Sequence, residues 1–396
     1  MASDKPGTPL VLERRDLEGL FRSLRARGYR IIGPVRRDSA IVYDALGSAA
    51  DLPVGWSAEH GPGRYRLTQR TDGRVFGDVV GPMPWRRFLH PPAEQTWTAT
   101  REATGFRLHA AARDETPYAF VGVRPCDLHA LAVLDRVLCG GRYVDCNYLA
   151  RRTLAFVVAV NCTQSAATCF CTSMKTGPAV DADVACDLVL TELVDAGRHE
   201  FVVDVRSDRG LSVIADVPHS IAHEDRRGEA ERLVARTAVG MVRSIDPDGL
   251  KERLYDSYQH PRWDEVAARC LACGNCTAVC PTCFCTTVAD TTDLHGSSAH
   301  REHRSDSCFG LSFSHLHGGD VRTSIKSRYR HWVMHKLATW VDQFGTSGCV
   351  GCGRCITWCP AGIDITEVVG AIRAGLVATP AAGKDKTSGN ARTDFA

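Results

Sequence analysis

The chain has 396 residues, of which 44% are hydrophobic and 24% are charged, and its formal net charge is +2. These values are ordinary for a globular protein of two or three domains, and the small net charge argues against nucleic acid or an anionic membrane surface as a partner. The longest apolar run, near Leu154–Val160, is too short to span a bilayer. No apolar segment of an export signal follows Arg14-Arg15, so we expect a cytoplasmic protein.

Residues 10–225 alternate short apolar segments with amphipathic ones. Leucine and phenylalanine recur at helical spacing over Leu10–Arg27, and a second helical pattern covers Leu128–Leu138. Strands are expected over Tyr29–Val35, Ala40–Leu46, Tyr65–Gln69, Ala119–Val123, Leu154–Val160, Leu188–Leu190 and Phe201–Val205. This alternation predicts an α/β-like N-terminal domain.

The remaining sequence divides into three segments. Residues 226–262 are expected to form a helical connector, beginning within a charged helix over Glu224–Val242. Residues 263–378 carry most of the cysteines and a second long helix over Ser324–Phe344, whose inward positions would be Ile325, Val333, Leu337, Trp340 and Val341. Residues 379–396 have the composition of a disordered tail. The predicted fold class is therefore α+β, with the α/β-like domain followed by an α-helical ferredoxin-type dicluster domain.

Eight of the 18 cysteines form two identical motifs. Each motif has the spacing C-x2-C-x2-C-x3-C and is followed by proline; the members are Cys270, Cys273, Cys276 and Cys280, then Cys349, Cys352, Cys355 and Cys359. This is the bacterial ferredoxin run, in which three cysteines bind one [4Fe–4S] cluster and the fourth binds the other cluster. Zinc is the alternative, but structural zinc sites use separated C-x2-C pairs.

The crossed arrangement defines two predicted clusters. Cluster 1 would be held by Cys270, Cys273, Cys276 and Cys359, and cluster 2 by Cys280, Cys349, Cys352 and Cys355. Gly274, Gly351 and Gly353 suit loops that wrap tightly around sulfur and iron. Crossed ligands would keep the two clusters close enough for electron hopping.

Four cysteines of the N-terminal region suggest a further site. Cys169 and Cys171 lie two positions apart in Thr-Cys-Phe-Cys, so extended chain would turn both thiols to one side. Cys162 ends an apolar strand, and Cys126 follows another strand within Arg124–Asp127, at a place where α/β domains form sites. We predict a third iron–sulfur cluster at Cys126, Cys162, Cys169 and Cys171; buried reduced thiols and a zinc site are the alternatives.

Other residues near these motifs have possible supporting roles. Cys283, Cys285 and Cys308 are candidate iron ligands, or residues that shield and tune a neighbouring cluster through hydrogen bonds to sulfur. Arg124 and Asp127 are expected to support a metal site. The basic segment Arg322–Lys336 is interpreted as a solvent-exposed surface, with a docking face or a raised cluster potential as the alternatives.

The motifs together resemble the β (iron–sulfur) subunit of cytoplasmic NAD(P)-linked [NiFe] hydrogenases of the sulfhydrogenase type, and the corresponding iron–sulfur subunit of anaerobic sulfite reductase shares the pattern. The resemblance rests on Gly-Val-Arg-Pro-Cys-Asp at 122–127, Asn-Cys and Thr-Cys-Phe-Cys within 161–178, Cys-Pro-Thr-Cys-Phe-Cys at 280–285, Arg-Ser-Asp-Ser-Cys at 304–308 and Cys-Val-Gly-Cys-Gly-Arg-Cys at 349–355. It covers residues 10–375.

The resemblance implies an electron-transfer subunit without catalytic residues of its own. Its partners would be the small and large [NiFe] hydrogenase subunits and a flavin- and NAD(P)-binding diaphorase subunit, and the family implies two [4Fe–4S] clusters. The chain itself has no Gly-x-Gly-x-x-Gly turn after a strand, so no dinucleotide site is expected in it. The alternatives are a sulfite reductase subunit that serves a sirohaem partner, a thiol or disulfide reductase that uses the N-terminal cysteines, and a zinc-dependent interaction module.

Overall fold

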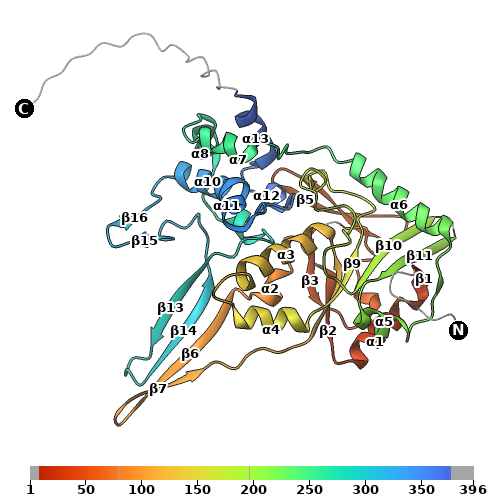
Figure 1. The fold of residues 1–396 in the computed structure, drawn as a ribbon, viewed down its shortest axis with the longest axis horizontal. Helices are drawn as coiled ribbons and strands as arrows, with labels where there is room; N and C mark the ends of the chain where they lie inside the picture. Colours follow the sequence, from red (N-terminus) through yellow and green to blue (C-terminus); the bar gives the residue numbers. More distant parts are fainter. Residues whose placement is uncertain (1–8, 79, 196, 376–396) are drawn as a thin grey trace, which may run out of the picture.

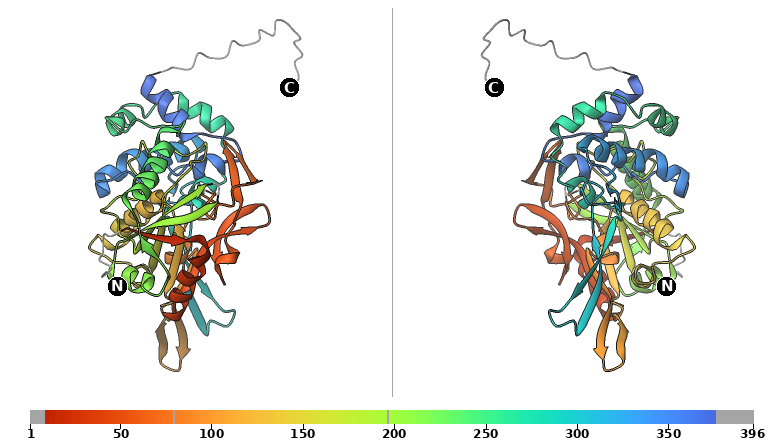
Figure 2. Two further views of the ribbon diagram at one scale, coloured as in Figure 1. Left: turned by 90° about the vertical axis from the view of Figure 1, so that its right-hand side faces the viewer. Right: turned by 90° about the vertical axis from the view of Figure 1, so that its left-hand side faces the viewer.

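A computed structural model describes residues 9–375 except Val79 and Ala196, so the predicted tail 379–396 lies outside the described residues. A large sheet with its helices fills one side of the molecule, and the helices of the dicluster region gather on another (Figure 1). A long β arm projects away from both, as the views in Figure 2 also show. The mixed α and β architecture agrees with the predicted fold class.

The large sheet has eight strands in the order β12-β1-β11-β10-β9-β8-β2-β3. The central strands β10, β9, β8 and β2 run parallel, and the outer pairings are antiparallel. The strands are β1 (Leu10–Glu13), β2 (Arg30–Arg37), β3 (Ala40–Ala45), β8 (Tyr118–Val123), β9 (Phe156–Val160), β10 (Leu188–Asp195), β11 (Arg198–Val205) and β12 (Ser220–Ile221). Strands β8 and β9 are buried throughout, because helices cover both faces of the sheet.

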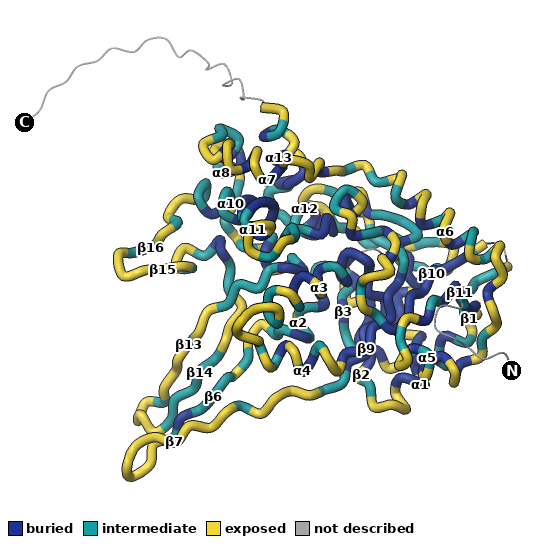
Figure 3. The backbone as a smooth tube through the Cα atoms, viewed as in Figure 1, coloured by how far each residue is buried: buried dark blue, intermediate teal, exposed yellow. Residues whose placement is uncertain are grey.

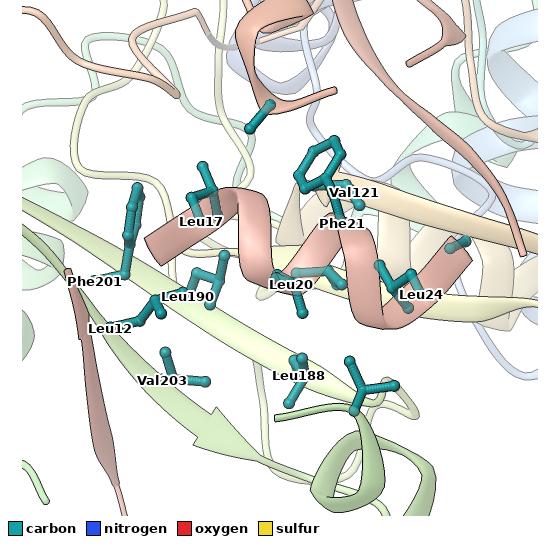
Figure 4. Packing of buried hydrophobic residues seen from close by; sticks show 14 of the residues in the cluster. Leu12, Leu17, Leu20, Phe21, Leu24, Val121, Leu188, Leu190, Phe201 and Val203 are labelled. Atoms are coloured by element: carbon teal, nitrogen blue, oxygen red, sulfur yellow. The ribbon is translucent and has the colours of Figure 1, made fainter. Parts of the chain in front are cut away.

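Helices α1 (Leu17–Ala26) and α5 (Asp208–Ile214) cover one face of this sheet. Figure 4 shows Leu20 of α1 on the side of Leu188 and Leu190 of β10, whereas Phe21 lies beside Val121 of β8. Helices α2 (Arg86–Leu89), α3 (Pro125–Cys139) and α4 (Cys146–Leu154) cover the opposite face. The result is a three-layer domain whose apolar core lies on both sides of the parallel strands.

The projecting arm is a four-stranded antiparallel sheet in the order β13-β14-β6-β7. Strands β6 (Ala93–Glu102) and β7 (Gly105–Ala110) come from the N-terminal region, whereas β13 (Thr286–Thr292) and β14 (Ser298–Ser305) come from the segment between the two cysteine motifs. The arm is exposed or half-buried along most of its length (Figure 3). The predicted boundary at residue 263 is therefore crossed by the pairing of β6 with β14.

The dicluster region is built from short helices around a core of its own. They are α7 (Leu250–Asp256), α8 (Arg262–Arg269), α9 (Asn275–Ala278), α10 (Ile325–Met334), a π-helical turn (His335–Thr339), α11 (Trp340–Phe344), α12 (Arg354–Thr357) and α13 (Ile365–Ala374). Helix α6 (Glu224–Val239) packs on β10 and β11 before this region begins. Two small hairpins, β4 (Trp56–Gly61) with β5 (Arg64–Gln69) and β15 (His315–Leu316) with β16 (Gly319–Asp320), complete the strands.

The structure differs locally from the sequence predictions. The predicted helix Leu10–Arg27 begins only at Leu17, because Leu10–Glu13 pairs with β11 as an edge strand and Arg14–Asp16 forms a 3-10 turn. Val341, predicted to face inward, is exposed, while Trp340 beside it is buried. Within the described residues, no helix has the length and apolar character needed to cross a membrane.

Candidate metal centre

The first cysteine motif forms one wall of a narrow cavity. Helix α8 ends at Arg269, immediately before Cys270, and Gly274, at φ 75°, turns the chain into α9. Only glycine adopts this left-handed conformation without strain. The cavity is lined by Cys270, Cys273, Cys276 and Cys359, together with Cys355. The fourth cysteine of the second motif thus lies with the first three of the first motif.

Aromatic residues of α10 close the same cavity. Tyr329 and Trp332 line it, and both are almost fully buried. Among the described residues, neither the Tyr329 hydroxyl nor the Trp332 indole N–H has a hydrogen-bond partner. A buried donor without a partner calls for a group that the protein itself does not supply. Cluster sulfur is such an acceptor, so this cavity fits an iron–sulfur cluster.

The second motif forms an adjoining cavity. It is lined by Cys280, Cys349, Cys352 and Cys355, with Phe170 and Lys336 among the other residues. Cys355 lines both cavities, which places them next to each other. Each cavity is therefore lined by the first three cysteines of one motif and the last cysteine of the other, and the first cavity is also lined by Cys355. The crossed ligand assignment stays a prediction.

Lys336 is a buried cation at the second cavity. Its Nζ lies 3.0 Å from Cys280 Sγ, 3.1 Å from Thr282 Oγ1 and 3.3 Å from the Gly348 carbonyl. A hydrogen bond from the Cys283 thiol and the nearby ammonium group hold the pKa of Cys280 well below its usual value, although burial opposes this. Interpreting the whole basic segment as solvent-exposed was wrong at this position, because Lys336 is 4% exposed.

The second Thr-Cys-Phe-Cys tetrapeptide lies beside these cavities without lining either of them. Cys283 hydrogen-bonds to Cys280, and Cys308 hydrogen-bonds to Cys285, whose pKa falls to about 7, chiefly through this bond. These contacts favour a tuning role for Cys283. Direct iron ligation by Cys283, Cys285 or Cys308 stays a prediction.

A buried ion pair joins the second motif to the N-terminal domain. Arg354, between Cys352 and Cys355, donates to both Asp127 oxygens, Nη1 to Oδ1 at 2.7 Å and Nη2 to Oδ2 at 2.8 Å. Both side chains are at most 1% exposed. Two parallel charge-assisted hydrogen bonds fix position as well as adding energy. Asp127 therefore positions the loop that carries these two cysteines.

The four N-terminal cysteines are also brought together. Cys126, Cys169 and Cys171 belong to one buried cluster that includes Cys352, while Phe170 points to a different core, as alternation along extended chain predicts. The Arg124 guanidinium donates to the Phe76 and Asp78 carbonyls, and its positive charge lies beside Cys162. Burial and the neighbouring Cys162 raise the pKa of Cys169 to about 12. All four thiols are at most 6% exposed.

The first Thr-Cys-Phe-Cys segment docks against the loop of the second motif. The Phe170 N–H donates to the Gly351 carbonyl at 2.8 Å, and the Thr176 hydroxyl donates to the Val350 carbonyl at 2.7 Å. A Cβ at Gly351 would lie 2.7 Å from the backbone N and Cα of Cys171, a distance at which one of the two segments must shift. The close approach requires glycine here.

Gly351→Ala is expected to lower the free energy of unfolding by about 2–4 kcal/mol, since it adds a steric clash to the strain of a positive φ. Gly345→Ala is the matched control, because Gly345 has nearly the same φ, 66° against 64°, and no atom within 4 Å of its Cβ position. Anaerobic urea unfolding of both variants measures the difference. Equal losses of unfolding free energy in the two variants would show that the contact with Cys171 does not contribute to stability.

The thiols of this centre are not arranged as a site for one ion. Among residues 9–375, excluding Val79 and Ala196, no group of three or more His, Cys, Asp or Glu side chains could hold a single metal ion. The zinc alternative therefore has no preformed site in the described part of the chain.

Comparison with known proteins identifies the relatives of this chain. A family profile for a 4Fe-4S dicluster domain matches residues 269–363. Sulfhydrogenase 2 subunit beta of Pyrococcus furiosus is 30% identical over 361 residues, which cover 90% of this chain and 96% of that protein. The chain belongs to the sulfhydrogenase beta subunit family. No solved structure matches it significantly.

Membership of the sulfhydrogenase beta subunit family, together with the dicluster domain, makes the chain an iron–sulfur electron-transfer subunit. The family resemblance drawn from the motifs is thereby confirmed. The dicluster match begins beyond the N-terminal cysteines and does not cover them. Sequence reasoning did not single out Tyr329 or the partner of Arg354. Lys336 was included only as part of a basic segment, and its burial beside Cys280 became evident only in the structure.

Proposed function

We propose that this chain relays single electrons through two [4Fe–4S] clusters between a flavin- and NAD(P)-binding partner and a [NiFe] hydrogenase module. Cluster 1 would be held by Cys270, Cys273, Cys276 and Cys359, and cluster 2 by Cys280, Cys349, Cys352 and Cys355. The observation that carries the proposal is the pair of adjoining cavities, which share Cys355 and each include the first three cysteines of one motif and the last cysteine of the other.

The residues around the cavities have roles that follow from their contacts. The thiolates would bind iron, and the aromatic wall of Tyr329 and Trp332 would exclude water and offer hydrogen bonds to sulfur. Lys336 would supply positive charge beside cluster 2. A [4Fe–4S] cluster held in such a cavity gains or loses one electron, at a potential set by burial, charge and hydrogen bonds to sulfur.

The choice of partners rests on the family. The relative from P. furiosus is named as the beta subunit of a sulfhydrogenase, a name that supports hydrogenase subunits as partners of this chain. A thiol or disulfide reductase finds less support, because its candidate cysteines are buried and the pKa of Cys169 is raised by burial first of all. An attacking cysteine needs access to its substrate and an available thiolate.

Electron paramagnetic resonance of the reduced protein tests the crossed ligands. Cys359→Ala is expected to remove the same signal as Cys270→Ala, and Cys280→Ala the same signal as Cys349→Ala. Each variant should lose about four irons per chain. If Cys359→Ala instead matched Cys349→Ala, each motif would hold its own cluster and the crossed assignment would be wrong.

Affinity purification of the full chain from its native cells, under anaerobic conditions, tests the partners. Nickel and flavin in the purified complex, with hydrogen-dependent reduction of NAD(P)+, are the expected result. A complex with sirohaem and no nickel would replace the hydrogenase assignment with the sulfite reductase one.

A further inference from the structure

We propose that Cys126, Cys162, Cys169 and Cys171 bind a third [4Fe–4S] cluster, adjacent to cluster 2 and outside the dicluster domain. Neither the matched profile, which begins at residue 269, nor the name of the relative assigns this site. The proposal extends the relay described above. Its role depends on that relay, but its existence can be tested separately.

The four cysteines converge from separate segments on one edge of the large sheet. Cys126 follows β8, and Cys162 follows β9, the parallel neighbour of β8. Both therefore lie at the carboxyl ends of adjacent parallel strands, where α/β sheets place their binding sites. Cys169 and Cys171 come from the loop that follows β9, and the Cys162 N–H is fixed by a 3.0 Å hydrogen bond to the Pro178 carbonyl. The fold thus gathers four thiols at a position suited to a ligand.

The packing gathers three of the four thiols, and Cys162 neighbours Cys169. Cys126, Cys169 and Cys171 share one buried cluster with Val80, Ala130 and Ala166. A Cβ at Gly177 would lie 3.2 Å from Cys171 Sγ and 3.3 Å from the Cβ of Pro125, the residue before Cys126. Gly177 therefore lies between the segment that carries Cys126 and the segment that carries Cys171, and its missing side chain lets the two segments approach.

The surroundings carry the positive charge that a buried anionic cluster needs. Four thiolates around a [4Fe–4S]2+ core carry a net charge of about −2, and a buried charge must be compensated. Arg124 is 3% exposed, donates to the Phe76 and Asp78 carbonyls, and places its positive charge beside Cys162. Cys126 lies in the first turn of α3, whose N-terminal end is positive. Asp78, 3.7 Å from Arg124, offsets part of that charge, and the nearby Arg354 is already paired with Asp127.

The position of the site connects it to the relay. Cys352, a predicted ligand of cluster 2, belongs to the same buried cluster as Cys126, Cys169 and Cys171. Phe170, between two of the proposed ligands, lines the cluster 2 cavity. One electron leaving cluster 2 would reduce the third cluster by one electron, which would extend the path into the N-terminal domain.

Iron and acid-labile sulfide in the anaerobically purified full chain test the proposal without any substitution. The expected content is about twelve irons and about twelve sulfides per chain, against about eight for two clusters. About eight irons with both dicluster signals present would overturn the third cluster and leave the proposed relay intact. About eight irons with one zinc would overturn it as well.

Substitutions assign the site. Cys126→Ala and Cys169→Ala are each expected to remove about four irons while both dicluster signals remain, and Cys186→Ala, a half-buried cysteine of the same domain, should keep all iron. Full iron retention in the first two variants would overturn these ligands. If one variant fails to fold, the other variant and the iron content of the unmodified chain still test whether the third cluster is present.

Discussion

Asp127→Asn is expected to lower the free energy of unfolding by about 3–5 kcal/mol, because it leaves the Arg354 guanidinium buried without its counter-charge. Arg354 is fully buried, and its remaining acceptors are the Gly81 carbonyl at 3.0 Å and the Tyr43 hydroxyl at 3.4 Å. The pair also joins the cysteine loop to α3, so iron should be released earlier during unfolding. Anaerobic urea unfolding, followed by fluorescence and by cluster absorbance, measures both effects.

Two further variants test this explanation. The double variant Asp127→Asn with Arg354→Gln removes both charges, and it should regain at least half of the loss. Asp44→Asn breaks an exposed pair, with side chains 48% and 60% exposed, and should cost less than about 1 kcal/mol. A loss of less than about 1 kcal/mol for Asp127→Asn itself would show that the interdomain contact does not depend on this charge.

Lys336→Met is expected to lower the reduction potential of cluster 2 by roughly 100 mV. A unit charge about 5 Å from the cluster, at an effective dielectric constant of about 20, contributes about 3 kcal/mol. The positive charge of Lys336 favours the reduced cluster, which carries one more electron. Removing this charge therefore favours the oxidised cluster and lowers the reduction potential. A redox titration monitored by electron paramagnetic resonance measures the shift.

Lys326→Met is the control for this prediction. Lys326 lies in the first turn of α10, the helix that precedes the π-helical turn carrying Lys336. Its ammonium group pairs with Asp264 near the surface. Its removal should change the cluster 2 potential by less than about 20 mV, because solvent and salt screen charges near the surface. Equal shifts in both variants would mean that the overall charge matters and that the contact with Cys280 does not.

The fold class and the dicluster domain could be predicted because they depend on local patterns. Apolar runs of five or six residues identified β8 and β9, and the cysteine spacing identified both motifs. The projecting arm was not predicted. Its strands, such as β14 with the sequence Ser-Ala-His-Arg-Glu-His-Arg-Ser, have few apolar residues, because the arm is largely exposed. Hydrophobic patterning reports burial, and little of this sheet is buried.

The residues that tune the site depend on contacts between distant parts of the chain. Arg354 and Asp127 are 227 positions apart, and only the folded chain shows that they pair. Lys336 occurs in a segment with many basic residues, of which Lys326 is half-buried and Lys336 fully enclosed. Sequence periodicity could not separate these two lysines, because a π-helical turn at His335–Thr339 changes the helical phase at this point.

The pairing of β6 with β14 has a consequence for the modularity of this chain. Excising residues 263–378 as a minimal ferredoxin would leave β14 with an open edge over Ser298–Arg304 and would remove Phe170 from the wall of the cluster 2 cavity. An unpaired edge strand is a template for self-association. The two halves of the chain therefore complete each other, and an excised or redesigned cofactor domain would have to replace both the β6 edge and the Phe170 wall.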